Sequence, residues 1–365
     1  MTRSRFIHAV LLFGAVNTLP AVVHAQRTVK IRGDARCSNC GVHLTRVFTI
    51  GGVDHPARLN QPNGAAINAS GELILSHVSD LNRVFVFDST GRFLRAIGRA
   101  GSGPGEFLLV RSLQIASGDT LLVFDNGGPR ISAFDNTYKF VSSFPAILNS
   151  HDFVRTASGE LVMNASIRTR EAAGYPLHVL GASGLRRSFG TTNPRSGREA
   201  SARLDRNLAA AGDGSLWAAH TTEYRIDHVD ASGRVVETLV RDVDWFRPHA
   251  SSFRIEADKP PAPRIRDIHV DEKGRLWILV LVADPDWKDA LTTTGRIQGR
   301  TSLGYTTPDA YFDSIIEVVD PRTGELVASG RSPHAILFLL NKGMALSYRE
   351  PDGVPYVDAW RLSVN

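Results

Sequence analysis

The chain is dominated by short runs in which apolar and polar residues alternate, each ended by a turn that contains glycine. Residues 92–135 show the pattern most fully, because they read as strand, Gly/Pro turn, strand, Gly-Asp turn, strand, turn and strand. Alternation with a period of two is typical of a β-strand with one buried face. A unit that recurs at a period of roughly 40–50 residues predicts a propeller or a solenoid.

Six segments share one order of elements: an apolar strand, a first turn, a strand, a variable loop, a strand, a second turn and a last strand. The first turns contain Gly71, Gly118, Gly159, Gly214, Gly274 and Gly343. Each is followed closely by an apolar run: LILS, LLVF, LVMN, LWAA, LWIL and ALSY. Glycine adopts the positive φ of such hairpin turns without steric cost. We therefore predict an all-β chain that forms a single six-bladed β-propeller with four-stranded blades.

The last segment stops at residues 356–364 without a fourth strand. Residues 44–51, LTRVFTIG, resemble the last strand of the first segment at residues 92–98, RFLRAIG. We expect residues 44–51 to complete the last blade, because this removes an exposed sheet edge that would invite aggregation. The predicted organisation is an N-terminal segment at residues 26–43 and a propeller at residues 44–365.

One stretch carries a family resemblance. Residues 97–107, IGRAGSGPGEF, are followed by LLVFD at residues 121–125 and by Arg130. This stretch resembles the NHL-type six-bladed β-propeller family, specifically over residues 84–135 and more weakly in the later blades. The run Gly101-x-Gly103 is not read as a dinucleotide motif, because a strand and not a helix follows it.

The first residues have the layout of a secretory signal. Arg3 and Arg5 precede an apolar stretch at residues 6–16, and Val23-His24-Ala25 offers a small-residue cleavage pattern. Asn17 and Pro20 interrupt the apolar stretch, which is short for a membrane span, although a retained anchor helix stays an alternative. We expect a signal peptide at residues 1–25 and an exported mature chain, periplasmic or extracellular, with no membrane span.

The two cysteines, Cys37 and Cys40, are predicted to form a local disulfide, as a close pair in an exported chain most simply does. A redox role would need a helix after the pair to lower the thiolate pKa, and no helical pattern follows. Haem attachment would need a histidine where Gly41 stands, and a zinc site would lack its second pair of ligands.

The charge balance excludes one class of partner. The formal net charge of +5 includes Arg3 and Arg5, so the mature chain carries 5 − 2 = +3. No block of lysine and arginine resembles a nucleic-acid-binding arm. We expect a monomer whose partner is an anionic small molecule or a protein or peptide, and no nucleic acid.

Candidate ligand-binding residues follow from aligning the blades on their first turns. In a propeller, the loops that lead into the first strand of each blade lie on one face, where ligands usually bind at the channel mouth. The aligned positions hold Asn63, Arg111, His151, Arg206, Arg266 and Ala335, with His334 one step from the last. Guanidinium groups suit carboxylate, phosphate or sulfate, so the pattern predicts an anion-binding funnel.

A structural role for the same arginines stays open. Like charges around a narrow mouth repel one another unless an anion or acidic side chains lie between them. Asp152, Asp205 and Asp267 stand beside the aligned positions in the sequence. Each arginine could therefore pair with a carboxylate of its own or the next blade.

Long insertions fall on the same face. The longest, residues 284–313, is predicted to form a basic, aromatic flap over the mouth, and solvated decoration is its alternative. Its candidate residues are Trp287, Lys288, Arg296, Arg300 and Tyr305. Shorter insertions lie at residues 166–175 and 240–264.

No catalytic signature is present: the sequence lacks a Gly-x-Ser-x-Gly elbow, a His-Glu-x-x-His helix and a Walker loop. The primary hypothesis is therefore an exported binding protein for an anionic small molecule, glycan or peptide terminus. The resemblance implies one alternative, a metal-dependent lactonase or lyase-like enzyme, which would use calcium or zinc. Only His151 and His334 lie near the aligned positions as imidazole ligands, so we predict no cofactor and no metal site. An envelope interaction scaffold is the third hypothesis.

Overall fold

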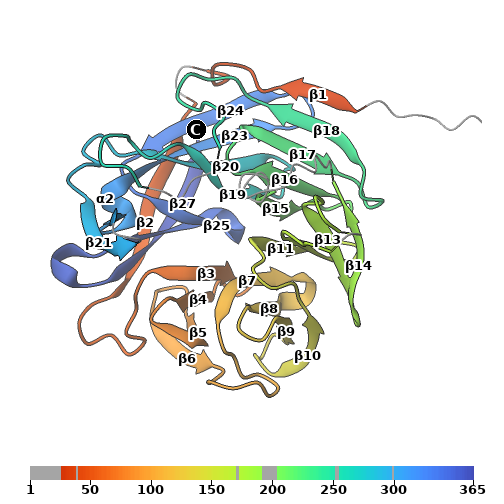
Figure 1. The fold of residues 1–365 in the computed structure, drawn as a ribbon, viewed down its shortest axis with the longest axis vertical. Helices are drawn as coiled ribbons and strands as arrows, with labels where there is room; N and C mark the ends of the chain where they lie inside the picture. The colour runs from red at the N-terminus through yellow and green to blue at the C-terminus, as the bar shows by residue number, and fades with distance from the viewer. Residues whose placement is uncertain (1–25, 38–39, 170–171, 191–203, 251–254, 298–299) are drawn as a thin grey trace, which may run out of the picture.

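The strands of the computed structural model form a ring of sheets around a central channel (Figure 1). The structure describes residues 26–37, 40–169, 172–190, 204–250, 255–297 and 300–365. Within these ranges, six sheets, each built on four antiparallel strands, make up the ring. The prediction of a six-bladed propeller with four-stranded blades is confirmed.

The first three blades each use four consecutive strands, with the first strand of each blade next to the channel (Figure 1). Blade 1 consists of β3 (Pro62–Ile67), β4 (Leu73–His77), β5 (Asp80–Phe87) and β6 (Phe93–Ile97). Blade 2 consists of β7 (Val110–Ala116), β8 (Thr120–Asp125), β9 (Arg130–Phe134) and β10 (Phe140–Pro145). Blade 3 consists of β11 (Asp152–Arg155), β12 (Leu161–Asn164), β13 (Leu177–Gly181) and β14 (Gly184–Phe189).

The last three blades carry the additions to the basic pattern. Blade 4 consists of β15 (Arg206–Ala210), β16 (Leu216–His220), β17 (Arg225–Val229) and β18 (Val235–Val240), with β1 (Arg27–Lys30) added at its edge. Blade 5 consists of β19 (Arg264–Val270), β20 (Leu276–Ala283), β23 (Phe312–Asp320) and β24 (Glu325–Ser332). Its insertion contains β21 (Leu291–Ile297), β22 (Arg300–Tyr305) and the one-turn helix α2 (Pro308–Tyr311). Blade 6 consists of β25 (Ile336–Leu340), β26 (Met344–Arg349), β27 (Tyr356–Val364) and β2 (Val42–Gly51). Short 3-10 turns occupy Ser117–Asp119, Asn341–Gly343 and Pro351–Gly353.

The hydrophobic core lies between neighbouring blades. One cluster joins Ile74 and Val86 of blade 1 to Val123 and Phe134 of blade 2, all of them buried. Such packing requires central strands that are apolar on both faces, and β20 is buried at every position from Leu276 to Val282. Each blade therefore depends on its two neighbours for the burial of its faces.

The ring is closed by pairing the two ends of the propeller. β2 runs antiparallel to β27, from the pair Val42 and Val364 to the pair Gly51 and Tyr356. This confirms that residues 44–51 complete the last blade, although the strand begins two residues earlier, at Val42.

An N-terminal strap, residues 27–41, adds contacts that the sequence did not predict. β1 pairs in parallel with β18 at the outer edge of blade 4. The chain then continues onto blade 5, where the Arg36 N–H donates to the Leu326 carbonyl at 2.9 Å. Gly41 forms an isolated β-bridge with Ser329 of blade 5, and β2 begins at the next residue. The strap therefore ties blades 4, 5 and 6 together along their outer edges.

A buried ion pair holds the strap in place. The Arg241 guanidinium lies 2.8 Å from the Glu317 carboxylate and donates to the Arg32 carbonyl of the strap at 2.8 Å. Tyr224 donates its hydroxyl to the other Glu317 oxygen at 2.5 Å. Burial raises the pKa of Glu317, and the charge of Arg241 opposes that rise.

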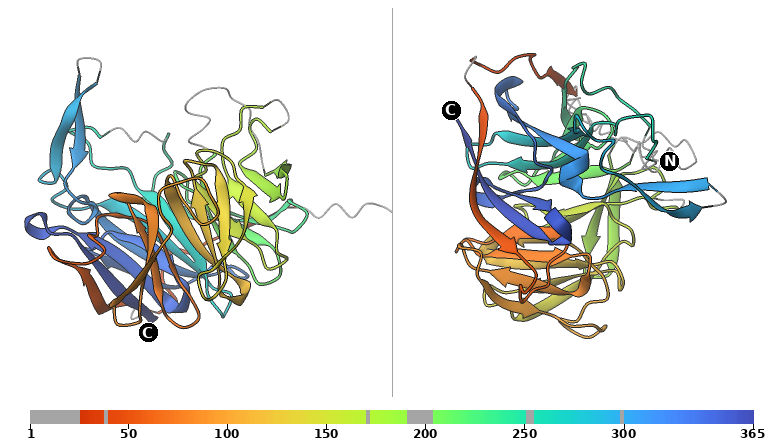
Figure 2. Two further views of the ribbon diagram at one scale, coloured as in Figure 1. Left: turned by 90° about the horizontal axis from the view of Figure 1, so that it is seen from below. Right: turned by 90° about the vertical axis from the view of Figure 1, so that its left-hand side faces the viewer.

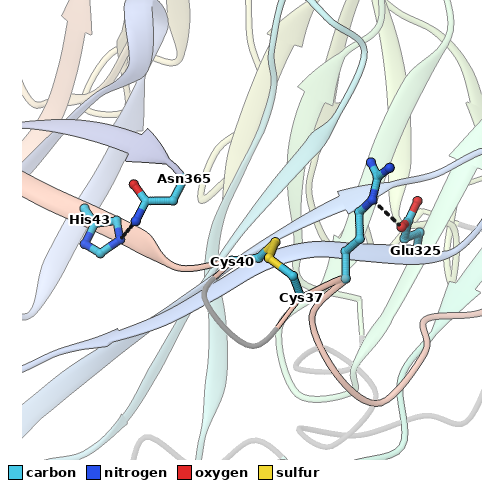
Figure 3. Close-up of a disulfide and its surroundings, with 6 residues drawn as sticks. Cys37, Cys40, His43, Glu325 and Asn365 are labelled. Atoms are coloured by element: carbon cyan, nitrogen blue, oxygen red, sulfur yellow. Dashed lines mark hydrogen bonds and ion pairs between the residues drawn. A yellow bond between two sulfur atoms is a disulfide. The ribbon is translucent and has the colours of Figure 1, made fainter.

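The disulfide predicted between Cys37 and Cys40 is confirmed and lies on the strap (Figure 3). Beside it, Arg36 forms an ion pair with Glu325 at 3.5 Å. On its other side, the ring of His43 and the amide of Asn365 are hydrogen-bonded at 2.8 Å (Figure 3). The loop is thus placed where the strap meets the C-terminal strand.

The predicted signal peptide, residues 1–25, lies outside the described residues. Within the described ranges, no helix has the length and apolar character that a membrane span requires.

Ring closure leaves no room for a side chain at Gly51. Its φ is +135°, and a Cβ there would lie 2.2 Å from the Pro355 carbonyl oxygen. Gly52 also has a positive φ, +111°, but a Cβ there would meet nothing within 4 Å. We predict that Gly51→Ala lowers the free energy of unfolding by about 1–3 kcal/mol more than Gly52→Ala, because only the first clashes.

Urea denaturation followed by tryptophan fluorescence measures both variants against the wild-type chain. Because the two substitutions share the strain of a positive φ, their difference isolates the clash with Pro355. If both variants lost the same free energy of unfolding, the close approach of Gly51 to Pro355, in the connection between β26 and β27, would be contradicted.

Candidate functional site

A cavity of about 980 Å³ occupies the central channel, which places it at the upper end of the ~300–1,000 Å³ range of small-molecule sites. The first strand of every blade, β3, β7, β11, β15, β19 and β25, contributes to its wall. The segment after β18 and the base of the blade 5 insertion add to the wall at the mouth. The channel is therefore open to a ligand and is not filled by side chains.

β-Bulges bring the key side chains into this cavity. In four of the inner strands the register with the next strand slips by one residue, and the extra residue is Asn63, Arg111, Arg266 or Leu337. A bulged residue leaves the regular ladder, so a bulge can redirect a side chain. All four residues line the cavity.

Arg111 and Arg266 are the two bulged cations. They come from blades 2 and 5, which lie across the ring from each other (Figure 1). Within the described residues, neither guanidinium has a hydrogen bond or an ion pair, although Arg266 lies over the Phe338 ring at 5.2 Å. Burial lowers the pKa of Arg266, and the charge of Arg111 lowers it further against the opposing effect of Asp267 and Asp152. Two like charges thus face one cavity, Arg266 partly buried and Arg111 exposed.

The carboxyl groups near Arg266 accept hydrogen bonds from the backbone of neighbouring blades. Asp152 accepts the backbone N–H of Leu208 in blade 4 at 2.7 Å. Asp267 in the same way accepts the backbone N–H of Leu339 in blade 6 at 2.7 Å. Each also accepts the N–H of the residue that follows it. These carboxyls therefore join blades, and neither lies within ion-pair distance of Arg111 or Arg266 in the described structure.

The carboxyl groups also carry less charge than exposed ones would. Burial raises the pKa of Asp152 to about 7, with the charge of Asp267 adding to the rise and the Leu208 N–H opposing it. Burial likewise raises the pKa of Asp267 to about 6 and that of Asp205 to about 6. Near neutral pH these groups are partly protonated, which leaves the arginines incompletely balanced.

Asn63 and His151 line the cavity but are hydrogen-bonded to neighbouring blades. Asn63 donates to the Val110 carbonyl at 2.9 Å. His151 donates from Nε2 to the Asn207 side-chain oxygen at 3.1 Å, because the amide nitrogen of Asn207 itself donates to a carbonyl. Burial lowers the pKa of His151 to about 4, and the charges of Arg266 and Arg111 contribute. The imidazole is therefore neutral near pH 7.

Arg206 does not lie where the alignment placed it. β15 has no bulge, and Arg206 pairs in regular register with His220. Side chains alternate along a strand, so Asn207 faces the cavity and Arg206 does not. Arg206 is buried instead beside Asp227 and the Asp205 carbonyl. The prediction that Arg206 lies at the channel mouth is therefore wrong.

His334 also lies away from the cavity. It stacks on Trp360 at 4.7 Å and lies 3.5 Å from Asp309, whose hydrogen bond raises the pKa of the imidazole. The bulged residue of blade 6 is Leu337, not Ala335. The alignment failed because this blade places its first turn closer to the bulge than the others do.

The predicted flap is a hairpin that stands away from the ring (Figure 2). Trp287 is buried at its base, against Tyr311, and Lys288 lies over the Trp287 ring. Tyr305, at the end of β22, lines the cavity. The side chains of Arg296 and Arg300 lie outside the described part of the structure.

Three further cavity residues were missed from the sequence. Arg264 stands two residues before Arg266, and both line the wall, so the Arg-x-Arg spacing was an available signal. Tyr311 and Phe338 were not singled out, because apolar residues in a β-protein usually belong to the core. Among the described residues, no three His, Cys, Asp or Glu side chains come together as metal ligands.

Comparison with known sequences gives a family match for part of the chain. The model of the family DUF5128, described as a 6-bladed β-propeller, matches residues 67–175. No curated protein sequence matches the chain.

Comparison with solved structures supports the same architecture. A Bacteroides fragilis protein named as exported has a TM-score of 0.55 and 11% identity, over 93% of this chain and 99% of its own. A member of the DUF4221 family from Bacteroides vulgatus has a TM-score of 0.57 and 8% identity, over 90% of this chain and 100% of its own.

A catalytically inactive virginiamycin B lyase from Staphylococcus aureus is also similar, with a TM-score of 0.46 and 12% identity over 87% of this chain and 99% of its own. At such identities the likeness concerns the fold alone, and it carries no activity to this chain. The structure and the comparisons together show that this chain is a six-bladed β-propeller.

Proposed function

We propose that this propeller binds an anionic small molecule, glycan or peptide terminus at the mouth of its central cavity. Arg111 and Arg266 anchor the anion. The observation that carries the proposal is that both guanidinium groups enter one cavity at bulges, without an ion pair among the described residues. Asp267 and Asp152, the acidic side chains that act on Arg266, each accept a backbone N–H of the next blade.

Electrostatics favours an anion between these groups. Arg111 is exposed and Arg266 is partly buried, and two cations that face one cavity raise each other's energy. A negative group that binds both relieves this cost. A guanidinium offers paired N–H donors that match carboxylate, phosphate or sulfate oxygens. The neutral His151 and Asn63 add polar wall surface without adding charge.

Export is part of the proposal. The basic and apolar pattern of residues 1–25 and the disulfide between Cys37 and Cys40 both suit an oxidising compartment. The glycine pattern of residues 84–135 supports NHL-type blades within this propeller. We propose a periplasmic or extracellular monomer.

Removal of either anchor is predicted to weaken anion binding. Arg111→Ala and Arg266→Ala should each raise the dissociation constant about tenfold or more for the best anion of a panel of acetate, citrate, phosphate and sulfate. Isothermal titration calorimetry measures the constants, and thermal shifts rank the panel. Arg361→Ala removes one exposed arginine outside the cavity wall and controls for net charge. Unchanged affinity in both anchor variants would refute the proposal.

Anion binding is also predicted to depend on pH. Asp267 and Asp152, with pKa values of about 6 and about 7, are neutral below these values and negative above them. A new negative charge beside Arg266 competes with the ligand, so affinity should fall about three- to tenfold between pH 5 and pH 8. Sulfate is a suitable probe because it keeps its charge throughout this range.

Asp152→Asn separates this effect from other titrations. The amide stays neutral, so the decline between pH 6 and pH 8 should shrink in the variant while the anchors remain. A wild-type affinity that is the same at pH 5 and pH 8 would contradict the assigned role of the two carboxyl groups.

A further inference from the structure

Four of the five phenylalanine and tyrosine rings of the cavity wall lie on one side of it. On the side of blades 5 and 6 the wall contains the rings of Tyr305, Tyr311, Phe312 and Phe338. On the side of blades 1 and 2 it contains polar groups, among them Gln61, Asn63, Ser112 and Gln114. A ligand in the mouth thus meets an aromatic surface on one side and hydrogen-bonding groups on the other.

We propose that the cavity selects anions that carry a ring with an apolar face, either an aromatic acid or a sugar acid, with Tyr305 and Phe338 as the surface against which the ring packs. The inference rests on the anion-binding function proposed above and names the ligand class of that same site. The two ligand types share one chemistry, an apolar ring face next to a negative group.

Tyr305 and Phe338 are the two half-buried rings of this wall. Tyr305 stacks on Tyr311 with ring centroids 4.7 Å apart and planes within 10°. It also packs edge-on against Phe312 at 5.7 Å. Tyr311 and Phe312 are both nearly inaccessible, at 2% and 4% exposure, so they support Tyr305 from behind. A ring held in this way is rigid and loses little entropy on binding a ligand.

The cations lie directly on these rings. The Arg266 guanidinium lies 5.2 Å from the centroid of Phe338, and the Arg264 guanidinium lies 5.0 Å from that of Phe312. The Tyr305 hydroxyl interacts with Arg264 and opposes the lowering of its pKa by burial. Stacking on the Phe338 ring leaves the in-plane N–H edge of the Arg266 guanidinium to donate to an anion. The anion anchor and the ring surface are therefore adjacent, as a ring-bearing acid requires.

The insertion of blade 5 builds this wall. Residues 284–311 stand between β20 and β23, where the corresponding connections in blades 1 and 2 occupy only residues 78–79 and 126–129. The insertion supplies Tyr305 and Tyr311, and its Trp287 packs against Tyr311 at 6.2 Å. An addition to one blade that places rings in the channel is a device for choosing a ligand, since the propeller itself closes without it.

Calorimetry with matched probes tests the inference. Benzoate and glucuronate carry a carboxylate on a ring, and acetate carries a carboxylate alone. We expect the wild-type protein to bind at least one ring-bearing probe about three- to tenfold more tightly than acetate. In Tyr305→Ala the ratio of the two dissociation constants should fall to within about twofold, and in Tyr305→Phe it should be kept. Circular dichroism melts confirm that each variant is folded, and Phe338→Ala gives a second reading of the same ratio.

The outcomes separate the two proposals. If none of the three probes binds the wild-type protein, the anion-binding function fails. If all three bind with equal affinity, or if the ratio survives in both Tyr305→Ala and Phe338→Ala, the ring preference is refuted while the anion site stands. A preference for benzoate alone assigns an aromatic acid, and a preference for glucuronate alone assigns a sugar acid.

Discussion

The propeller depends on hydrogen bonds between side chains beside the channel and the backbone of the next blade. Each of the six junctions around the channel has such a bond in the described structure. Five involve inner-strand side chains: Asn63 with Val110, Gln114 with Arg155, Asp152 with Leu208, Asn207 with Ile265 and Asp267 with Leu339. The sixth joins Asn341, in the turn after β25, to Ile67. Backbone groups beside the channel would otherwise be left without partners where the strands of different blades do not pair. These bonds join each blade to the next around the cavity.

The same requirement explains how Arg111 and Arg266 come to face the cavity. Short polar side chains of the inner strands, such as Asp152 and Asp267, are hydrogen-bonded to the backbone of the next blade. Bulges place Arg111 and Arg266 outside the regular ladder, so their longer side chains are not needed by the scaffold. Burial then keeps the neighbouring carboxyl groups partly neutral. Arg111 and Arg266 thus face the cavity without an ion pair among the described residues, while Asp152 and Asp267 hold the blades together.

The additions to the ring lie on one side of it, the side of blades 4, 5 and 6. Blades 4, 5 and 6 carry the N-terminal strap on their outer edges, and blade 5 carries the hairpin on the mouth face (Figure 2). The buried Arg241 and Glu317 pair lies beneath the strap on this same side. Blades 1, 2 and 3 lack these additions among the described residues. The reinforced side is also the side that holds the aromatic wall and Arg266.

The glycine turns and alternating strands were enough to predict the blades and the closure by residues 44–51, because an antiparallel hairpin is specified by residues close in sequence. The Cys37 and Cys40 pair was predictable for the same reason of local spacing. Counting from the turns located Asn63, Arg111, His151 and Arg266 at the cavity. It failed for Arg206 and His334, because the direction of a side chain depends on a bulge, and a bulge depends on pairing with the neighbouring strand. The strap, the junction bonds and the aromatic wall join residues far apart along the chain, so only the assembled ring decides them.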